Sequence, residues 1–483
     1  MLFNSYSFIF LFLPLTLAGF FLVARFSHRT AALWLVLASI FFYGWWDPRY
    51  VPLLLTSIIF NYSIGYAINR ARPDDKATPR AKLLLYLGVS GNLLLLGYYK
   101  YTDFFVSTSN ALAGTDLPLL HIVLPLGISF FSFTQIAFLV DVYRGLAREY
   151  NPIHYTLFVT YFPHLIAGPV LHHKQMMPQF HRPETYRINI ANVNVGLTIF
   201  TIGLFKKVIL ADQFALYANP VFNAAAAGAS ITTVEAWLGA LAYSLQLYFD
   251  FSAYSDMAIG LSKLFNIDLP VNFNSPYKSR NIIEFWRRWH MTLSAFLRDY
   301  LYFPLGGNRH GAARRYFNLT ATMVLGGLWH GANWTFVLWG ALHGFYLVMN
   351  HGWQALSARL PWPRIPGGAL IAGAVTFVAV VIAWVLFRAA DVDTAVRILR
   401  PMAGQGGGLS LMVPHMPSPL AVVFLWISGG LAVVTLAPNS LEISAWLDTR
   451  KSRQGLLGYA VGATLVFIVL NFNKVSTFIY FNF

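Results

Sequence analysis

His330 has the clearest chemical potential of any residue in this sequence. It lies in the motif Gly-Gly-Leu-Trp-His-Gly (residues 326–331), near the middle of an apolar run from about Phe317 to Met349. An ionisable side chain in a membrane segment is costly to bury and marks a candidate functional site. Because an imidazole titrates near neutral pH, it is suited to take a proton from an attacking hydroxyl group. The pattern alone supports a catalytic base and a neutral, hydrogen-bonded histidine equally.

A second histidine, His290, lies in an aromatic and basic stretch. The sequence predicts one helix that begins near Asn281, with Asn281 as its N-cap and Glu284 in position for a capping box. His290 would border the apolar stripe of this helix, with arginines facing outward, as in a helix at the membrane interface. The predicted stripe consists of Ile282, Trp286, Trp289, Leu293 and Phe296. The pattern slightly favours an interfacial anchor over a catalytic role.

The same stretch carries many arginines, for which two roles are open. Contact with lipid headgroups and control of topology is the commoner role of such residues. The alternative role is to hold an anionic cytoplasmic ligand, such as the phosphates of a nucleotide-like cofactor. The predicted cofactor-binding residues are Arg287, Arg288, Arg298 and Arg309, and Arg314 and Arg315 belong to the same basic surface.

Two carboxylates, Asp250 and Asp256, lie in the long apolar run that includes residues 246–257. Carboxylates in such a segment must pair with a cation or line a polar cavity. Pairing with an arginine of the central stretch is one interpretation. The other is that they line, together with Tyr254, a passage for a hydroxylated acceptor, and the sequence supports both equally.

Several common catalytic patterns are absent from the sequence. It contains no cysteine, which excludes disulfides, cysteine-ligated metal and a cysteine acyl-enzyme. It contains no His-Glu-x-x-His zinc motif and no Gly-x-Ser-x-Gly nucleophile motif. His172 and His173 are adjacent, which is poor spacing for metal ligands. We therefore expect no metal.

The elements that must position these residues are membrane helices. Of the 483 residues, 57% are hydrophobic and 11% are charged, whereas soluble proteins carry about 25% charged residues. Apolar runs extend from end to end, which predicts a single membrane-embedded domain over residues 1–483, all-α and polytopic, with the catalytic stretch at about 245–345. We expect about 11 crossings, since some apolar stretches are short or broken and therefore re-entrant or interfacial. The candidate stretches are 6–24, 31–46, 50–68, 83–99, 122–140, 153–170, 192–211, 233–262, 317–332, 334–350, 369–388, 419–437 and 456–473.

The net charge of +15 indicates lysine and arginine in cytoplasmic loops rather than nucleic-acid binding. The basic stretches Arg70–Lys82 and Lys278–Arg315 are accordingly predicted to be cytoplasmic and to contact membrane lipid.

The apolar N-terminus, Met1–Phe20, lacks a basic leader and a small-residue cleavage site. We expect it to be the first transmembrane helix rather than a cleaved signal.

Several motifs, in order along the chain, resemble the membrane-bound O-acyltransferase family. The resemblance is closest to its bacterial exopolysaccharide branch, typified by the alginate O-acetyltransferase membrane subunit and its cellulose-acetylating relatives. Its motifs extend from Leu124 to about Gly344. They are Leu-Pro-Leu-Gly-Ile-Ser-Phe (124–130), Val-Asp-Val-Tyr-Arg-Gly (140–145), Phe-Pro-His-Leu-Ile-Ala-Gly-Pro (162–169), Tyr-Phe-Asp-Phe-Ser-Ala-Tyr-Ser-Asp-Met (248–257), Phe-Trp-Arg-Arg-Trp-His (285–290), Arg-Asp-Tyr-Leu-Tyr-Phe-Pro-Leu-Gly-Gly-Asn (298–308) and Gly-Gly-Leu-Trp-His-Gly (326–331).

The resemblance implies a ring of helices around a central passage in the bacterial inner membrane. His330 matches the characteristic histidine of the family, and His290 matches its second histidine motif. The resemblance also implies acetyl-CoA as the cytoplasmic acyl donor and a polysaccharide as the acceptor on the other side. Proteins of this kind usually work with a periplasmic or membrane-anchored esterase-like acetyltransferase.

The mechanism expected from these residues has His330 as the general base in acetyl transfer. Asn333 would lie about one turn beyond His330 if the helix continues, where it could donate to the oxyanion. Two alternatives stay open. One is transfer of a D-alanyl or other acyl group to a wall polymer or lipid. The other is a membrane transporter, because intramembrane histidines, carboxylates and broken helices also mark solute pathways.

Overall fold

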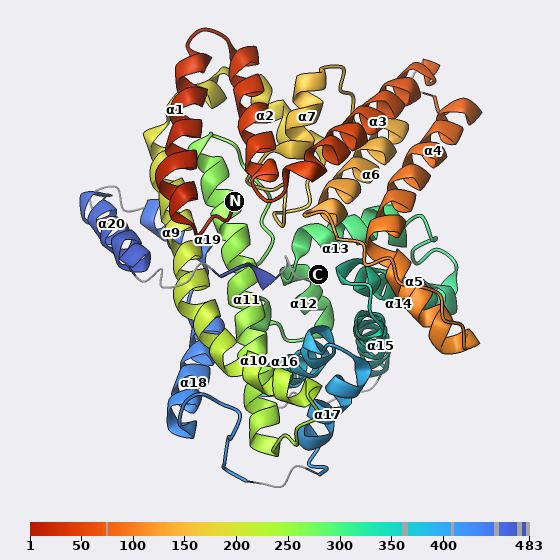
Figure 1. Cartoon of the computed structure of the whole chain (residues 1–483), viewed down its shortest axis with the longest axis vertical. Helices are drawn as coiled ribbons and strands as arrows, with labels where there is room; N and C mark the ends of the chain where they lie inside the picture. The colour runs from red at the N-terminus through yellow and green to blue at the C-terminus, as the bar shows by residue number, and fades with distance from the viewer. Residues whose placement is uncertain (74–75, 360–365, 407–409, 449–453, 471–475, 480–483) are drawn as a thin grey trace.

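The computed structural model describes residues 1–73, 76–359, 366–406, 410–448, 454–470 and 476–479. All regular secondary structure in these ranges is helical, which confirms the predicted all-α class. The helices α1–α4, α6 and α7 occupy one end of the molecule and α16–α18 the other, with α5 and the short helices α12 and α13 between them (Figure 1). The N-terminal helices are α1 (Leu13–Ala24), α2 (His28–Gly44), α3 (Val51–Arg70), α4 (Pro79–Leu96), α5 (Thr102–Ala113), α6 (Ile128–Arg144), α7 (Pro152–Thr160) and α8 (His173–Met176).

The central helices follow, and short π and 3₁₀ turns join many of the elements. The central helices are α9 (Ile190–Phe205), α10 (Asp212–Ala226), α11 (Thr233–Leu264), α12 (Ile282–Arg288) and α13 (Met291–Leu297). The C-terminal helices are α14 (Gly311–His330), α15 (Trp334–Ser357), α16 (Gly368–Arg388), α17 (Val392–Met402), α18 (Leu420–Leu436), α19 (Ser440–Asp448) and α20 (Gln454–Leu470). The short turns are η1 (Ser7–Phe12), η2 (Pro48–Tyr50), η4 (Gly97–Tyr101), η5 (Met177–His181), η6 (Pro183–Tyr186), η7 (Lys206–Ala211), η8 (Pro276–Lys278) and η9 (Arg298–Tyr302).

Apolar helices make this a multi-pass membrane protein. Within the described residues, five helical stretches are long and apolar enough to cross a membrane, and the bent pair formed by α18 and the start of α19, which meet at 57°, would make a sixth. The helical stretch Ser7–Ala24 coincides with the first predicted apolar stretch, 6–24. The count of about 11 crossings is not confirmed. The five stretches are Ser7–Ala24, Pro48–Arg70, Pro79–Ala113, Ile190–Ala226 and Gly368–Arg388.

One predicted span is wrong. The apolar run 153–170 forms a helix only as far as Thr160, and the chain then turns. Pro163 and the Gly168-Pro169 pair explain the break, because proline lacks the amide hydrogen that a helix interior requires. This compact turn lies inside the protein and brings Ile166 to the wall of the site described below.

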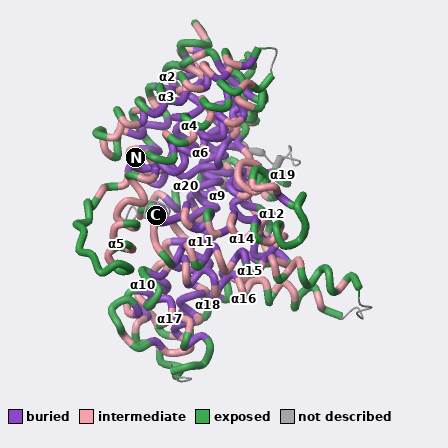
Figure 2. Tube along the Cα trace, turned by 90° about the vertical axis from the view of Figure 1, so that its right-hand side faces the viewer, coloured by how far each residue is buried: buried purple, intermediate pink, exposed green. Residues whose placement is uncertain are grey.

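Helix α11 is the axis of the fold, because it contributes residues to both hydrophobic clusters of the core. It starts at a capping box in which the side chains of Thr232 and Glu235 each accept from the other's backbone amide. Almost every residue from Leu238 onward is buried, and Figure 2 shows buried segments concentrated through the centre of the molecule. Residues 253–264 pack with the N-terminal helices, whereas residues 238–251 pack with the C-terminal ones.

Candidate active site

The turn between α14 and α15 places His330 in the core. Helix α14 ends at His330, and the next residue, Gly331, has an extended backbone. A Cβ atom at Gly331 would collide with the ring of Phe336, and one at Gly327 or Gly340 would collide with the backbone of the facing helix. These glycines therefore allow a tight hairpin whose turn carries His330, which is 4% exposed.

Aromatic rings surround His330. Its ring centroid lies 5.0 Å from that of Trp329, 5.1 Å from Phe387 and 5.2 Å from Trp339, each in an edge-to-face arrangement. The ring of His290 is 6.4 Å away. The two histidines, 40 positions apart in the sequence, therefore share one enclosed, mainly apolar region. We call His290, His330 and the rings around them the closed centre. Its low polarity strengthens any charge interaction made inside it.

A buried hydrogen-bond network fixes the orientation of His290. Its Nδ1 lies 3.0 Å from the side-chain oxygen of Asn272. That oxygen also accepts from the hydroxyl of Thr292 at 2.9 Å, and the Asn272 amide nitrogen donates to Ser255 at 3.2 Å. Because an amide oxygen only accepts, Nδ1 of His290 carries the proton, and Nε2 is the basic nitrogen of the neutral ring. This is the tautomer that can take a proton through Nε2.

The prediction of one continuous helix through His290 is wrong. The chain forms α12, breaks at Trp289 and His290, and resumes as α13. His290 itself has a left-handed backbone (φ 42°). Backbone hydrogen bonds to an irregular segment replace the helical ones, since Asn274 N donates to Arg288 O and Met291 N donates to Asn272 O, both at 2.9 Å. His290 is therefore fully buried rather than on an interfacial stripe. The predicted N-cap Asn281 is confirmed by its bond to Glu284 N at 2.9 Å.

Lys100, which the sequence interpretation did not single out, reaches the end of α14. Its Nζ donates to the carbonyl of Trp329 at 2.6 Å, to that of His330 at 3.1 Å and to the hydroxyl of Ser129 at 3.3 Å. The neighbouring Tyr101 hydroxyl donates to Leu328 O at 2.8 Å. The last carbonyls of a helix lack partners and carry partial negative charge, so a lysine is well matched to them. Lys100 thereby ties η4 to the turn that carries His330.

A small cavity of about 40 Å³ lies between Lys100 and His330. Its wall includes residues 124–130, the Leu-Pro-Leu-Gly-Ile-Ser-Phe motif, together with Ile166 and Trp329. A volume of this size holds roughly a water-sized group. A larger substrate therefore needs movement of the surrounding side chains to reach His330.

A third imidazole, His343, was also missed. It is fully buried on α15, and its Nδ1 accepts from the indole of Trp286 at 3.3 Å. The sequence contained a signal for each of the two missed residues, Lys100 and His343. Lys100 interrupts an otherwise apolar and aromatic stretch, Tyr-Tyr-Lys-Tyr (98–101), and His343 lies in the same apolar run as His330.

The buried carboxylates of α11 are paired, but with lysines rather than arginines. Asp250 receives Lys207 Nζ at 2.7 Å and the backbone amide of Ile479 at 2.9 Å. Asp256 receives Lys206 Nζ at 2.7 Å. Tyr254, between them, packs against the ring of Phe478 at 4.7 Å. The two lysines come from η7, which the sequence interpretation did not connect to this run. A role in an acceptor passage stays a prediction.

Two of the four predicted phosphate-binding arginines have a carboxylate partner. Arg288 forms an ion pair with Glu284 at 2.9 Å, and Arg298 forms one with Asp299 at 2.7 Å. Arg287 and Arg309 are exposed. None of the four lines the cavity beside His330.

Helix α14 ends at His330, so the condition under which Asn333 would lie one helical turn beyond His330 is not met. Asn333 is the N-cap of α15, where its side-chain oxygen accepts from Thr335 N at 3.0 Å. Its amide nitrogen donates to Ala390 O at 2.7 Å. The Asn333 side chain thus fixes the start of α15 and its contact with the segment after α16.

Comparison with known proteins agrees with this architecture. The model of the MBOAT, or membrane-bound O-acyltransferase, family matches residues 40–387, a range that contains the closed centre and Lys100. The chain therefore belongs to the membrane-bound O-acyltransferase family and is an acyltransferase. The resemblance of its motifs to this family is confirmed.

Two relatives are similar over most of the chain. A peptidoglycan O-acetyltransferase of Helicobacter pylori is 44% identical over 436 residues, which are 84% of this chain and 80% of the relative. A probable alginate O-acetylase, AlgI, of Pseudomonas aeruginosa is 44% identical over 412 residues, 84% of this chain and 75% of the relative. A teichoic acid D-alanyltransferase of Bacillus subtilis is 28% identical over 268 residues, 52% of this chain and 65% of the relative.

Proposed function

We propose that the protein transfers acetyl groups from cytoplasmic acetyl-CoA across the bacterial inner membrane for O-acetylation of an exopolysaccharide. The polymer would be of the alginate or cellulose type. The observation that carries this proposal is the 44% identity, over 84% of the chain, to relatives named as a peptidoglycan O-acetyltransferase and a probable alginate O-acetylase. Family membership favours this enzyme function over the transporter alternative.

In the proposed reaction, His330 acts as the general base. It removes the proton of an acceptor hydroxyl as that oxygen attacks the thioester carbon of acetyl-CoA. Collapse of the tetrahedral intermediate breaks the carbon–sulfur bond, and the imidazolium returns the proton to the CoA thiolate. The products are an acetate ester and free CoA. General-base catalysis of this kind contributes roughly 10²–10⁴-fold, and alignment and oxyanion stabilisation supply the rest.

Other side chains support this reaction in the proposal. His290, with its basic Nε2 in the same closed centre, assists or relays the proton. Lys100 holds the carbonyl of His330 and so fixes the position of the imidazole. Arg287 and Arg309, which are exposed, are the better candidates for the CoA phosphates, because Arg288 and Arg298 already have carboxylate partners.

The acceptor side of the proposal involves a second protein. Within the described residues, no soluble domain accompanies the helices. We propose that a periplasmic or membrane-anchored esterase-like acetyltransferase takes the acetyl group and places it on the polymer. The acceptor would approach past Asp250, Tyr254 and Asp256 on α11, which lie on the axis of the fold.

Transfer of a D-alanyl group to a wall polymer is the second candidate. It is supported by the relatives named as teichoic acid D-alanyltransferases, such as that of Bacillus subtilis. Their identity of 28% covers about half of this chain (52%), so acetyl transfer is favoured.

The test uses inverted membrane vesicles with matched amounts of inserted wild type, His330→Ala or His310→Ala. His310 is an exposed histidine outside the closed centre and serves as the control. Release of CoA from acetyl-CoA and labelling of the partner or polysaccharide are measured, with a D-alanyl donor in a parallel reaction. Acetyl transfer by wild type and His310→Ala, but not by His330→Ala, is expected. Full transfer by inserted His330→Ala would refute the general-base role, and turnover of the D-alanyl donor alone would favour the second candidate.

A further inference from the structure

A second histidine-rich region lies away from the closed centre, around the loop that joins α6 to α7. A pocket of about 840 Å³ opens there between the start of α2, this loop and the segment 173–181. Its size is within the range of small-molecule sites, about 300–1,000 Å³. It shares no lining residue with the cavity beside His330. We call it the open pocket; its charged and imidazole lining residues include Arg29, Arg148, Glu149, His154, His173 and Lys174.

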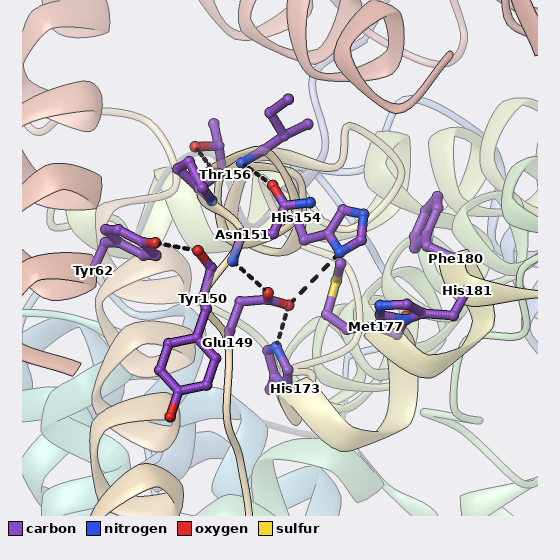
Figure 3. A network of polar contacts seen from close by, with 12 residues as sticks. Tyr62, Glu149, Tyr150, Asn151, His154, Thr156, His173, Met177, Phe180 and His181 are labelled. Carbon is purple, nitrogen blue, oxygen red and sulfur yellow. Dashed lines mark hydrogen bonds and ion pairs between the residues drawn. The ribbon is translucent and has the colours of Figure 1, made fainter. Parts of the chain in front are cut away.

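A buried carboxylate, Glu149, lies at the centre of a network of polar contacts in the lining of the open pocket (Figure 3). Glu149 is 7% exposed and accepts from His173 Nε2 at 3.2 Å and from the backbone amide of Asn151 at 2.8 Å. His154 Nδ1 lies 3.9 Å from the same carboxylate. Burial opposes ionisation of Glu149, but the hydrogen bonds from His173 and Asn151 outweigh it and lower the pKa of this carboxyl group. Glu149 is therefore an inward-facing anion that fixes the loop and the imidazoles.

The rim of the open pocket is cationic. Arg29 on α2, Arg148 on the loop and Lys174 on α8 all line it, and all three side chains are exposed. We call these three residues the rim cations. They come from three separate elements, so the fold, rather than a local run of basic residues, brings them to one pocket. With the histidines neutral, the lining carries three positive charges against the single negative charge of Glu149.

We infer that the open pocket binds a phosphate-bearing ligand. Three cations that line one concave site suit a group with several anionic oxygens, because each oxygen can accept a charge-assisted hydrogen bond. Met177, Pro178 and Tyr150 in the lining offer apolar contact to the rest of such a ligand. Within the described residues, His, Asp and Glu side chains form no group arranged to hold a metal ion.

Two sources could supply this phosphate chemistry, namely a soluble nucleotide or the headgroup of an anionic phospholipid. The inference does not rest on the proposed acetyl transfer, because binding is measured without turnover. The experiment uses the purified full-length protein in phosphatidylcholine nanodiscs. Binding of labelled ADP is measured by equilibrium dialysis, with adenosine as the probe that lacks phosphate. In a second arm, the nanodiscs contain phosphatidate, and lipid retained by the protein is quantified by native mass spectrometry.

The informative variant is Arg29→Ala/Lys174→Ala/Arg148→Ala, in which all three changes are at exposed positions and leave the core intact. The matched control is Arg25→Ala/Arg182→Ala/Arg187→Ala, which removes the same charge from exposed arginines outside the pocket lining. We expect ADP, or retained phosphatidate, to bind at least about tenfold more weakly to the rim variant and within about twofold to the control.

The result shows which ligand the open pocket binds, or that it binds neither. If the rim variant loses ADP binding but retains phosphatidate, the ligand is a soluble nucleotide. If it loses phosphatidate but still binds ADP, the ligand is a lipid headgroup. Equal binding of adenosine and ADP, equal weakening by both variants, or binding of neither probe to the wild type would overturn the inference.

Discussion

The closed centre and the open pocket are built from similar side chains but have opposite environments. In the closed centre, His290 and His330 are 0% and 4% exposed, and aromatic rings separate them from solvent. In the open pocket, two imidazoles contact or approach a buried carboxylate, beneath exposed cations. Exclusion of water strengthens interactions with a developing charge during a reaction. An accessible ring of cations instead suits reversible binding of an anion.

This difference also explains the way in which each histidine is oriented. His290 bonds to a neutral amide, which fixes the tautomer without adding charge to an apolar region. His173 bonds to an ionised carboxylate, which is tolerated because the pocket opens to solvent and carries compensating cations. The comparison therefore predicts that the two regions respond independently to substitution.

His330→Ala is expected to have the largest effect. Loss of the general base should lower acetyl transfer by roughly 10²–10⁴-fold, while ADP or phosphatidate binding at the open pocket stays within about twofold of wild type. Transfer is measured in vesicles and binding in nanodiscs. If His330→Ala also abolished binding at the open pocket, the two regions would have to be treated as one site.

Lys207→Met tests whether the carboxylates paired with Lys207 beside α11 require this cation for the stability of the fold. Lys207 bonds to Asp250 at 2.7 Å and to Asp212 at 2.9 Å, and its side chain is 3% exposed. Removing one partner of a buried pair costs about 3–5 kcal/mol, because the remaining charge is uncompensated. Unfolding in mild detergent measures the loss, and adding Asp250→Asn should restore part of it.

Lys263→Met is the matched control, because its ion pair with Asp268 is partly exposed and such pairs contribute about 0–1 kcal/mol. If Asp250→Asn alone abolished transfer without lowering stability, Asp250 would be a passage residue rather than a structural anion. Similar losses from Lys207→Met and Lys263→Met would contradict the structural assignment.

Lys100→Met probes the support of the closed centre. It leaves the carbonyls of Trp329 and His330 without their ammonium donor, and hydrogen bonds to a charged group are worth about 1.5–3 kcal/mol. Because Lys100 positions His330, kcat should fall by about 10–100-fold with little change in KM. Lys100→Arg should restore part of the rate, and exposed Lys82→Met is the control. A rise in KM with unchanged kcat would instead place Lys100 at substrate binding.

Much of the architecture followed from local patterns. The two helices on either side of the turn at His330 were predicted as the apolar stretches 317–332 and 334–350, which lie almost wholly within α14 and α15. The long helix α11 was predicted as 233–262. These predictions succeeded because long apolar runs bounded by glycine or asparagine leave little choice of structure.

The remaining features depend on contacts between distant segments. The break at His290 arises from backbone bonds to residues 272–274, which no helical period reveals. Lys100 reaches carbonyls about 230 positions away, and Lys206 and Lys207 replace the expected arginine partners of α11. The open pocket combines residues that are unremarkable individually. Sequence patterns identify ionisable residues that are costly to bury, but only the fold identifies the partners that neutralise or hydrogen-bond them.

The smallest expected effect concerns the acid response of the open pocket. The folded protein lowers the pKa of Glu149 below its ordinary value of 4.5, chiefly because hydrogen bonds from His173 and Asn151 outweigh burial. Burial lowers the pKa of His154 below 6.5.

Each group therefore contributes stability that is fully present above its ordinary pKa and is lost as the pH falls toward its folded value. The thermal unfolding temperature should thus decrease in two stages below pH 6.5. Glu149→Gln should reduce the loss below about pH 4.5, whereas exposed Glu184→Gln should keep the wild-type profile. If Glu149→Gln and wild type had the same acid profile, Glu149 would not be the ionised anchor of this pocket.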